Sequence, residues 1–349
     1  MQKITVHTSA PYDILIGGGL LEEAGERLAA LAPGAAVAVV TDDQVDRYYG
    51  DALLESLRRS GIRAAKYVFP HGEASKSLPS AERLYQFFSE NEITRKDLAV
   101  ALGGGVAGDL AGFAAATWLR GVRYVQIPTT FLAAIDSSVG GKTAVDIPAG
   151  KNLVGAFWQP SLVLCDPRTL DTLSDKDFAD GAAEAIKYAA IFDRPLLDLL
   201  ADGRARERLD TVIARCIQWK REVVEEDERD TGRRQLLNFG HTLGHAIEKL
   251  SHFSVSHGQG VAVGMVELTR RTEALGLTEP GCAEILAKAL AAYRLPTRYE
   301  GGLGELCPAI LGDKKRKGGR ITFITLQTLG HAVLTDVDAG KIAPFLGAE

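Results

Sequence analysis

The first half of the chain alternates short apolar runs with helical patterns, and this alternation constrains the fold more than any other feature. The runs lie at Ala35–Thr41, Arg63–Phe69, Leu98–Leu102, Tyr124–Pro128 and Ser161–Asp166. An amphipathic helical pattern at Ser80–Glu90 separates two of them. Continuously apolar strands that alternate with helices are typical of a parallel sheet covered on both faces. We therefore predict an α/β fold whose ligand sites lie at the carboxyl edge of the sheet.

Three motifs follow predicted strands at that edge. The run GGGVAGDLAG at Gly103–Gly112 opens a helix near Val106, so its glycines can let the backbone approach a pyrophosphate beside free N–H groups. A tight turn without any ligand is the alternative. Asp42 follows the first strand, where a carboxylate either hydrogen-bonds a ribose hydroxyl or caps the next helix, and the sequence leaves both open. Thr129 and Thr130 offer hydroxyls to a cofactor.

The segment IDSSVGGKTAVDIPAGKN, residues 135–152, is expected to form a Gly-rich loop at the same edge. Two glycines stand before Lys142, and Lys151 and Asn152 end the segment. The glycine spacing excludes a Walker A motif. Two lysines in such a loop nevertheless indicate phosphate contacts.

After the last predicted strand of this series, long helical patterns replace the strand pattern. A turn-rich stretch at Leu170–Ser174 precedes them. We place the domain boundary there and expect an α/β domain at residues 1–172 and a mainly α-helical domain at residues 173–349.

The stretch LLNFGHTLGHAIE in the second half carries the strongest metal-site signal. Asn238, His241, His245 and Glu248 follow one another at steps of three or four, so on a helix they share one face. Two histidines one turn apart can converge on a single ion. An isolated HxxxH pair is, however, often solvated or hydrogen-bonded within the fold.

Two further residues can complete such a site. His257 opens a new apolar helix, and Glu184 lies in the helical stretch DGAAEAIKYAAI. A carboxylate and imidazoles suit zinc, with a position left for substrate. Lys187 lies one turn after Glu184; an exposed pair of this kind contributes little, but the alanine-rich surroundings indicate a buried helix. Spacing alone does not assign a role to Lys220 or Arg234.

Composition limits the partners that the chain can have. The net charge of −5 argues against general binding to nucleic acid or to an anionic membrane, so an anionic substrate needs a local basic cluster. No apolar run approaches the roughly 20 residues that span a bilayer. The four cysteines are scattered without a zinc-ribbon or CxxC pattern and are expected to be buried, reduced thiols. We therefore expect a cytoplasmic protein.

Taken together in their order, the motifs resemble the 3-dehydroquinate synthases, sugar-phosphate cyclases of the shikimate route to chorismate and the aromatic amino acids. The motifs are GEASK, GGGVAGDLAGF, PTT, DSSVGGKT, GKNLVGAFWQP, AEAIKY, LLNFGHTLGHAIE, HGQGVAVG and DKK, and they cover nearly the whole chain. The resemblance implies a Rossmann-like N-terminal domain that binds NAD and a helical C-terminal domain. It also implies that zinc or cobalt lies with the substrate in the cleft between them.

The resemblance assigns roles residue by residue. It implies that Glu184, His241 and His257 are the metal ligands, so that His245 is a catalytic histidine near the substrate phosphate and not a ligand. The implied NAD contacts are Asp42, Glu73, Lys76, Gly105, Val106, Ala107, Gly108, Asp109, Thr129, Thr130, Lys142, Lys151, Thr169, Leu170, Asp171 and Thr172. The implied substrate contacts are Asp136, Lys142, Asn152, Lys187, Lys220, Arg234, Asn238 and either Lys314 or Lys315. Arg120 resembles an arginine that reaches the phosphate from the second subunit of a homodimer.

The implied reaction converts 3-deoxy-D-arabino-heptulosonate 7-phosphate, a phosphorylated keto acid, to 3-dehydroquinate and phosphate. NAD takes a hydride transiently, phosphate leaves by β-elimination, the ketone is reduced again, and an intramolecular aldol reaction closes the ring. The chain departs from the family pattern at Gln44, where Asn is usual, and at Gln259, where HGQG replaces HGEA. Gln259 is expected to affect hydrogen bonds next to the metal site.

Two other enzyme classes fit parts of the pattern. A metal-dependent polyol dehydrogenase has a similar glycine turn, but Glu184 and the basic residues argue against it. A sister cyclase acting on a neutral sugar phosphate is the second alternative. DSSVGGKT, Lys220 and Arg234 favour the carboxylated substrate.

Overall fold

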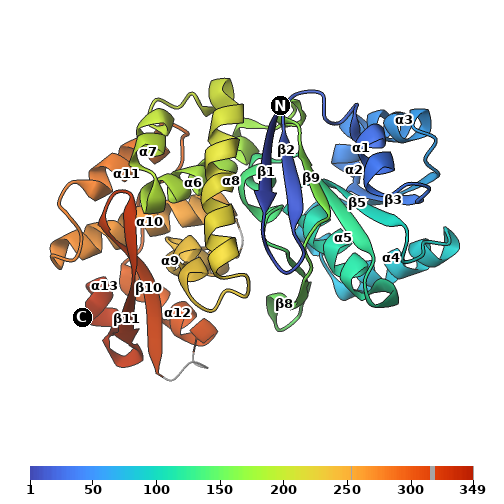
Figure 1. Cartoon of the computed structure of the whole chain (residues 1–349). Coiled ribbons are helices and arrows are strands. Elements are labelled where there is room, and N and C mark those ends of the chain that lie inside the picture. Colours follow the sequence, from blue (N-terminus) through green and yellow to red (C-terminus); the bar gives the residue numbers. More distant parts are fainter. Residues whose placement is uncertain (253, 315–318, 349) are drawn as a thin grey trace. The chain divides into compact units, whose positions relative to one another are not determined.

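The computed structural model describes residues 1–252, 254–314 and 319–348, without the side chains of residues 313 and 314. Two compact units are present: residues 1–174 with 220–229, and residues 175–219 with 230–349. In Figure 1 the first unit is mostly blue to green and the second mostly yellow to red. The domain boundary at residue 172 stays a prediction. Within the described ranges, no helix is long and apolar enough to cross a membrane.

The first unit is built on a seven-stranded sheet in the order β1-β2-β9-β6-β5-β3-β4. β1 runs antiparallel to β2, and the other neighbours are parallel. The strands span Gln2–Val6 (β1), Tyr12–Ile16 (β2), Val37–Asp42 (β3), Ala64–Phe69 (β4), Leu98–Gly103 (β5), Arg123–Pro128 (β6) and Leu162–Cys165 (β9). All five predicted strands are therefore confirmed, with small shifts at their ends.

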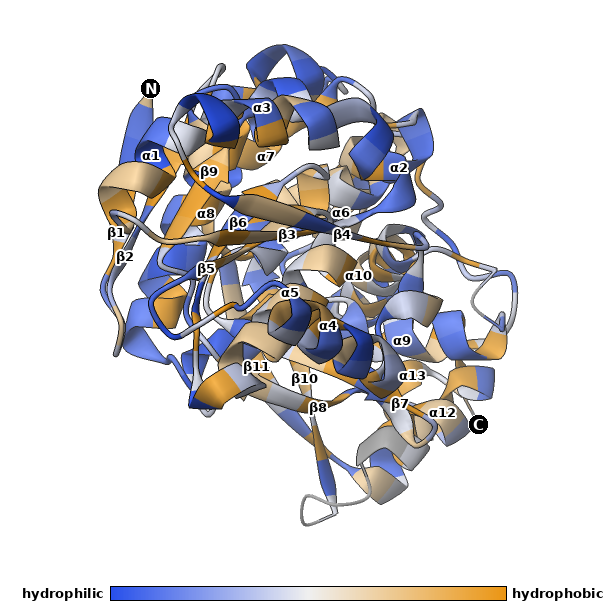
Figure 2. Cartoon of the chain, turned by 90° about the vertical axis from the view of Figure 1, so that its right-hand side faces the viewer, coloured by the Kyte–Doolittle hydropathy of each residue, from blue (hydrophilic) through white to orange (hydrophobic). Residues whose placement is uncertain are grey.

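Alternate residues of the central strands feed two separate cores, which explains why these strands are apolar throughout. In β5, Leu98, Val100 and Leu102 join the core that also contains Leu53 and Leu57 of α3. The residues between them, Ala99 and Ala101, join the opposite core under α4 and α5. Figure 2 shows the hydrophobic colour on strands such as β5 and β9 and the hydrophilic colour on much of α2 and α3. Both faces of the sheet are thus covered, as predicted.

The helices of the first unit include the two that the sequence predicts. They span Ala24–Leu31 (α1), Asp43–Val45 (α2), Asp51–Arg59 (α3), Leu78–Glu90 (α4) and Gly105–Thr117 (α5). α4 begins with a Ser77 side chain that accepts a hydrogen bond from the Ser80 N–H, and it buries Leu84 and Phe88. The predicted helix is therefore confirmed with its buried Leu84 and Phe88, although it begins two residues earlier than predicted.

The segment 135–152 is not one Gly-rich loop, and that prediction is wrong. After a helical turn at Ala133–Ser137, β7 (Lys142–Ile147) and β8 (Gly150–Phe157) form an antiparallel hairpin. Thr143 and Val145 are buried while Lys142 is exposed, which is the alternation of a half-buried strand. Lys142 and Lys151 therefore lie on the two strands of a hairpin, and its register fixes their spacing.

The second unit is mainly helical, as predicted, and it is built around α10. Its elements are α6 (Asp175–Phe192), α7 (Arg194–Leu200), the first part of α8 (Leu209–Glu226), α9 (His241–Leu250), α10 (His257–Ala274), α11 (Cys282–Ala291), α12 (Cys307–Lys314), β10 (Arg320–Thr328), β11 (His331–Asp338) and α13 (Ile342–Leu346). α10 packs against α6, α9 and α11. All four cysteines are buried and free, which confirms the expectation for them.

Candidate active site

The second unit brings Glu184, His241 and His257 together from three different helices. One ligand atom from each side chain lies within 4.8 Å of the other two. The His241 Nε2 atom is 3.5 Å from Glu184 Oε1, and the His257 Nε2 atom is 3.3 Å from the same oxygen. Glu184 lies in the middle of α6, whereas the two histidines are the first residues of α9 and α10.

Glycines at the start of α10 make this convergence possible. A Cβ atom on Gly258 would lie 2.4 Å from the Asp180 Cα atom of α6, and one on Gly260 would lie 3.0 Å from the Gly244 carbonyl oxygen of α9. A Cβ atom on Gly264 would lie 2.1 Å from the Gly240 carbonyl oxygen. Real Cβ atoms essentially never show the distances at Gly258 and Gly264, and the distance at Gly260 is tight, so glycine lets α10 approach both helices this closely. The HGQGVAVG motif therefore sets the helix crossing that carries the cluster.

Both histidines have acceptors for their Nδ1–H groups, and this orients the rings. The His241 Nδ1 atom is 3.1 Å from the Phe239 carbonyl oxygen. The His257 Nδ1 atom is 3.0 Å from Glu248 Oε1. With the proton on Nδ1, each ring presents its Nε2 atom toward Glu184, which is the arrangement of metal-binding imidazoles.

The electrostatics of the cluster favour a bound cation. Glu184 is 2% exposed and forms an ion pair with Lys187, yet neither carboxylate oxygen has a hydrogen bond of normal geometry within the described part of the chain. Burial alone would raise the pKa of Glu184, but the charges of Lys187 and the histidines hold that pKa well below its usual value. Burial lowers the pKa of His241 to about 3. One ionised carboxylate and two Nε2 donors fit a divalent ion such as zinc or cobalt.

Burial opposes the protonation of His257, but its two carboxylate neighbours outweigh burial. The nearby carboxylates of Glu184 and Glu248 raise the pKa of His257 to about 10. Without a metal, the two carboxylates keep the His257 Nε2 atom protonated. A metal ion that binds this atom would therefore displace that proton.

His245 lies one turn after His241 and is more exposed. Its ring centroid is 5.3 Å from that of His241 and 5.9 Å from that of His257. It belongs to a second group of possible ligands, formed with Glu248 and His257. The HxxxH pair is therefore split between two groups that share His257.

The prediction that Asn238 shares a helix with His241 is wrong. A 3₁₀ turn at Arg233–Asn238 ends before Gly240, which has a left-handed φ of 79°, and α9 begins after it. The left-handed residue breaks the regular spacing on which the prediction depended. Arg234 in this turn is 2% exposed, and Lys187 on α6 is 1% exposed. Two of the basic residues expected near the substrate, Lys187 and Arg234, thus have buried side chains, which spacing could not reveal.

The predicted nucleotide contacts of the first unit lie after parallel strands whose carboxyl ends share one edge. The chain leaves β3 for β4 on one side and returns to β5 on the other, so the strand order reverses between β3 and β5. Asp42 ends β3 and Gly103 ends β5 at this point, and a Cβ atom on Gly103 would be 3.7 Å from Asp42 Oδ2. The Oδ1 atom of Asp42 accepts from the N–H groups of Gln44 and Val45 at 2.9 Å each. Asp42 therefore caps α2 with one oxygen and turns the other toward Gly103.

Two further features of this edge suit a dinucleotide. The residue that precedes α5 is Gly104, which has no side chain to accept a hydrogen bond from the first N–H groups of the helix. Thr129 is 2% exposed, and its hydroxyl has no hydrogen-bond partner in the ranges that the structure covers. An uncapped helix start and an unsatisfied buried hydroxyl fit a polar anionic ligand.

Lys76 and Asp109 form a buried ion pair next to the same helix start. Their charged atoms are 2.5 Å apart, and Lys76 is 5% exposed. Glu73 lies 4.0 Å from Lys76 and 3.7 Å from Lys151. Burial raises the pKa of Asp109, although the charge of Lys76 opposes this. These four predicted contacts thus form one charged group.

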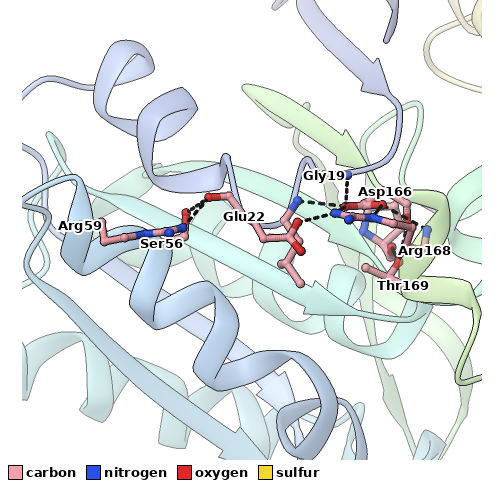
Figure 3. Close-up of polar contacts among 9 residues, drawn as sticks. Gly19, Glu22, Ser56, Arg59, Asp166, Arg168 and Thr169 are labelled. Atoms are coloured by element: carbon pink, nitrogen blue, oxygen red, sulfur yellow. Dashed lines mark hydrogen bonds and ion pairs between the residues drawn. The ribbon is translucent and has the colours of Figure 1, made fainter.

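A network around Asp166 fixes the turn that contains Thr169, Leu170, Asp171 and Thr172 (Figure 3). The Asp166 carboxylate accepts from the N–H groups of Gly19 at 2.9 Å and Leu21 at 3.2 Å, and from the Arg168 guanidinium at 3.0 Å. The Thr169 hydroxyl donates to the Pro128 carbonyl oxygen at 3.1 Å. The turn is therefore tied to the ends of β6 and β9, which places it at the carboxyl edge of the sheet.

Lys220 and Asp136 form a largely buried ion pair within the first unit, with side chains 8% and 16% exposed. Asn152 lies in the hairpin with a left-handed φ of 57°, and its N–H group donates to Asp146 Oδ1 at 2.8 Å. Of the alternatives Lys314 and Lys315, the side chain of the first and the whole of the second lie outside the described residues. At the two departures from the family pattern, the backbone N–H of Gln44 donates to Asp42 Oδ1, and the side-chain Oε1 of Gln259 accepts from the Ser256 N–H at the start of α10.

Glu248 was recognised only as a polar residue on the face of α9, and sequence reasoning gave it no role. It is 6% exposed and contacts His257. The signal was its position seven residues after His241, which on a helix is the same face two turns on.

Comparisons with known proteins show which family the chain is similar to. Residues 66–180 match the family model described as 3-dehydroquinate synthase N-terminal, and residues 181–316 match the one described as 3-dehydroquinate synthase C-terminal. The 3-dehydroquinate synthases of Clostridium acetobutylicum and Enterococcus faecalis are 41% and 42% identical, over 96% and 97% of this chain and 96% of each relative. The structure of 2-epi-5-epi-valiolone synthase from Streptomyces hygroscopicus subsp. jinggangensis, with NAD⁺ and Zn²⁺ bound, is similar with a TM-score of 0.88 at 27% identity, covering 99% of this chain and 98% of that one.

Proposed function

The chain belongs to the 3-dehydroquinate synthase family, and we propose that it converts 3-deoxy-D-arabino-heptulosonate 7-phosphate to 3-dehydroquinate and phosphate. The observation that carries this proposal is the cluster of Glu184, His241 and His257 in a chain that matches the family over nearly its full length. The cluster provides the ligands that the reaction needs for a divalent ion. The reaction oxidises and reduces its substrate within one turnover, so NAD is not consumed.

The metal is held by the Glu184 carboxylate and the Nε2 atoms of His241 and His257. A bound zinc or cobalt ion supplies Lewis-acid polarisation of a substrate hydroxyl and eases its deprotonation. The protein residues keep the donor atoms in place: the Phe239 carbonyl and Glu248 fix the two rings, and Lys187 neutralises part of the buried charge.

NAD is held at the carboxyl edge of the sheet. The start of α5 offers N–H groups to the pyrophosphate, Thr129 offers its hydroxyl, and Asp42 offers Oδ2 to a ribose hydroxyl. NAD supplies a reversible acceptor for the substrate hydride. The remaining predicted contacts around Lys76 and the turn at Thr169 border the same edge.

The substrate carries a carboxylate and a phosphate, and the chain binds it with basic residues in spite of a net charge of −5. Lys187, Lys220 and Arg234 are buried cations, which interact with anions more strongly than exposed ones. Asp136 orients Lys220 through their ion pair. Lys142, Asn152, Asn238 and Lys314 complete the proposed substrate set.

His245 is the proposed catalytic histidine. It is exposed, lies beside the two histidine ligands, and has an imidazole that can exchange a proton with the substrate phosphate. We expect His245→Gln to lower turnover without releasing the metal.

The homodimer is the last part of the proposal, with Arg120 reaching the substrate phosphate of the second subunit. Arg120 is exposed and follows Leu119, and both have left-handed φ angles, 66° and 49°. Left-handed backbone at non-glycine residues costs about 1–3 kcal/mol each and clusters at functional sites, which supports a functional role for this turn. Sedimentation velocity should show a dimer, and a monomer with full activity would contradict this assignment.

The reaction class is tested by following phosphate and NADH together. With the heptulosonate phosphate, Zn²⁺ and NAD, the chain should release phosphate with no net NADH. Accumulation of NADH would instead indicate a polyol dehydrogenase. Faster release of phosphate from sedoheptulose 7-phosphate would indicate a sister cyclase, and release from no substrate would contradict the proposal altogether.

A further inference from the structure

Glu248 is a buried carboxylate that contacts a proposed metal ligand without being one. It lies on α9, is 6% exposed, and its Oε1 atom is 3.0 Å from the His257 Nδ1 atom. The other nitrogen of the same ring, Nε2, lies 3.3 Å from Glu184 Oε1. The imidazole of His257 therefore stands between two carboxylates, one on each nitrogen.

The two histidine ligands differ in what holds their Nδ1 atoms. His241 has a neutral acceptor, the Phe239 carbonyl oxygen at 3.1 Å. His257 has an ionisable one, Glu248. A carboxylate acceptor withdraws the Nδ1 proton partly from the ring and makes the Nε2 atom a stronger donor to a metal. His257 is also the more exposed of the two, with a side chain 36% exposed against 14% for His241, so it has fewer packing contacts to orient it.

The helix crossing holds Glu248 in this position. A Cβ atom on Gly260 would lie 3.3 Å from the Glu248 Cγ atom, so the side chain runs against the backbone of α10. His257 is the first residue of the same helix. The carboxylate is therefore packed beside the element that carries the ring it contacts.

We propose that Glu248 is a positioning residue that holds the Nδ1–H group of His257 and so presents the Nε2 atom to the metal ion. This inference rests on the proposed metal chemistry. It concerns the strength and geometry of metal binding, and Glu248 itself does not touch the metal or the substrate.

The structure also offers a competing arrangement, because His245, Glu248 and His257 form a second possible ligand group. If the ion bound there, Glu248 would be a direct ligand and His245 would be another. The two arrangements differ in whether His245 affects metal affinity, and this difference makes the inference testable.

The test is a measurement of Zn²⁺ affinity on the metal-stripped full-length chain, by competition with a chromophoric chelator. Glu248→Ala should weaken Zn²⁺ binding by about 10- to 100-fold. Glu248→Gln keeps the shape and an acceptor but loses the charge, so its loss should be smaller. Glu273→Gln is the matched control, since Glu273 lies on α10 and accepts from the Ala283 N–H at 2.8 Å away from the cluster. Its Zn²⁺ affinity should equal that of the wild type.

A second readout reports the coordination geometry of the metal rather than its affinity. The visible absorption of the Co²⁺-loaded chain depends on the ligand field, so Glu248→Gln should shift it while Glu273→Gln should not. Circular dichroism and thermal unfolding show whether Glu248→Ala is folded, and the nearly isosteric Glu248→Gln serves if it is not.

Two results would overturn the inference. The first is a Zn²⁺ affinity within about twofold of the wild type in both Glu248 variants. The second is a His245→Ala variant that loses as much affinity as Glu248→Ala, because Glu248 would then be a ligand in the second group. A wild-type chain that binds no Zn²⁺ would contradict the proposed metal chemistry instead, so the two failures are distinguishable.

Discussion

The proposed metal cluster (Glu184, His241 and His257) and the proposed nucleotide edge (the carboxyl ends of β3, β5 and β6) are assembled in different ways. At the nucleotide edge, parallel strands end side by side, so residues just after the strands come together whatever the helices do. In the metal cluster, three helices have to approach one another closely, and Gly258, Gly260 and Gly264 on α10 permit this. Glycine therefore frees the backbone for a ligand in one region and allows helices to touch in the other.

The largest expected effect comes from removing a ligand of the cluster. His257→Ala should abolish tight metal binding and lower turnover by about a thousandfold or more, because the metal supplies several kcal/mol of transition-state stabilisation. Elemental analysis and a phosphate-release assay check this, with the exposed His331→Ala as the control. A metal content equal to that of the wild type would remove His257 from the ligand set.

A substitution at the nucleotide edge should instead weaken NAD binding and leave metal binding unchanged. Lys76→Met removes the partner of Asp109 next to the start of α5 and should weaken NAD binding by roughly 10-fold or more while leaving zinc content unchanged. Lys66→Met is the matched control, because Lys66 pairs with Asp46 at 2.6 Å. Calorimetric titration with NAD measures the effect. Loss of zinc in Lys76→Met would mean that the two regions do not act separately.

A smaller effect tests the helix crossing. A Cβ atom on Gly244 would lie 2.9 Å from the Gly260 carbonyl carbon, so Gly244→Ala should lower the free energy of unfolding by about 1–3 kcal/mol and also weaken zinc binding. Gly340→Ala is the control, since nothing lies within 4 Å of a Cβ atom there. Urea unfolding measures the free energy of unfolding of both variants. A Gly244→Ala variant as stable as the wild type would show that the two helices can move apart without a cost in stability.

An effect on stability alone is expected at the turn beside the nucleotide edge. Burial would raise the pKa of Asp166, but the hydrogen bonds from Arg168 and the backbone lower it more. A carboxyl with a lowered folded pKa stabilises the fold above its unfolded pKa of about 4, and this contribution is lost as the pH falls through the folded pKa. Asp166→Asn should therefore cost about 1–3 kcal/mol at neutral pH, and less as the pH falls below about 4. Urea unfolding of the wild type and of Asp166→Asn, at neutral pH and below a pH of about 4, measures this difference in the free energy of unfolding. A difference that does not change with pH would contradict the prediction.

Much of the α/β fold was predictable because its signal is local. Strands buried on both faces are largely apolar, and β3, β5, β6 and β9 follow that pattern. The edge strand β4 was also predicted, although most of its residues are only partly buried. The β7–β8 hairpin was missed because its glycines and lysines outweighed a weak alternation over a few residues. β11 was missed as well, since an exposed strand lacks an apolar run.

The site was predictable where chemistry or family motifs marked it, and not where burial decided. Spacing suggested that His241 and His245 bind one ion, but the structure groups His241 with Glu184 and His257. The left-handed Gly240, which separates Asn238 from α9, has no helical signature of its own. The burial of Lys220 and Arg234 depends on tertiary packing, which their charged sequence surroundings conceal.

The central claim is that Glu184, His241 and His257 bind one divalent ion, and X-ray absorption at the zinc edge tests it directly. The zinc-loaded chain should show two imidazole nitrogens and one carboxylate oxygen at about 2.0–2.2 Å. His245→Ala should leave the spectrum unchanged, whereas His257→Ala should not retain zinc in this site. A sulfur ligand at about 2.3 Å, or an imidazole signal lost in His245→Ala and kept in His257→Ala, would contradict the account.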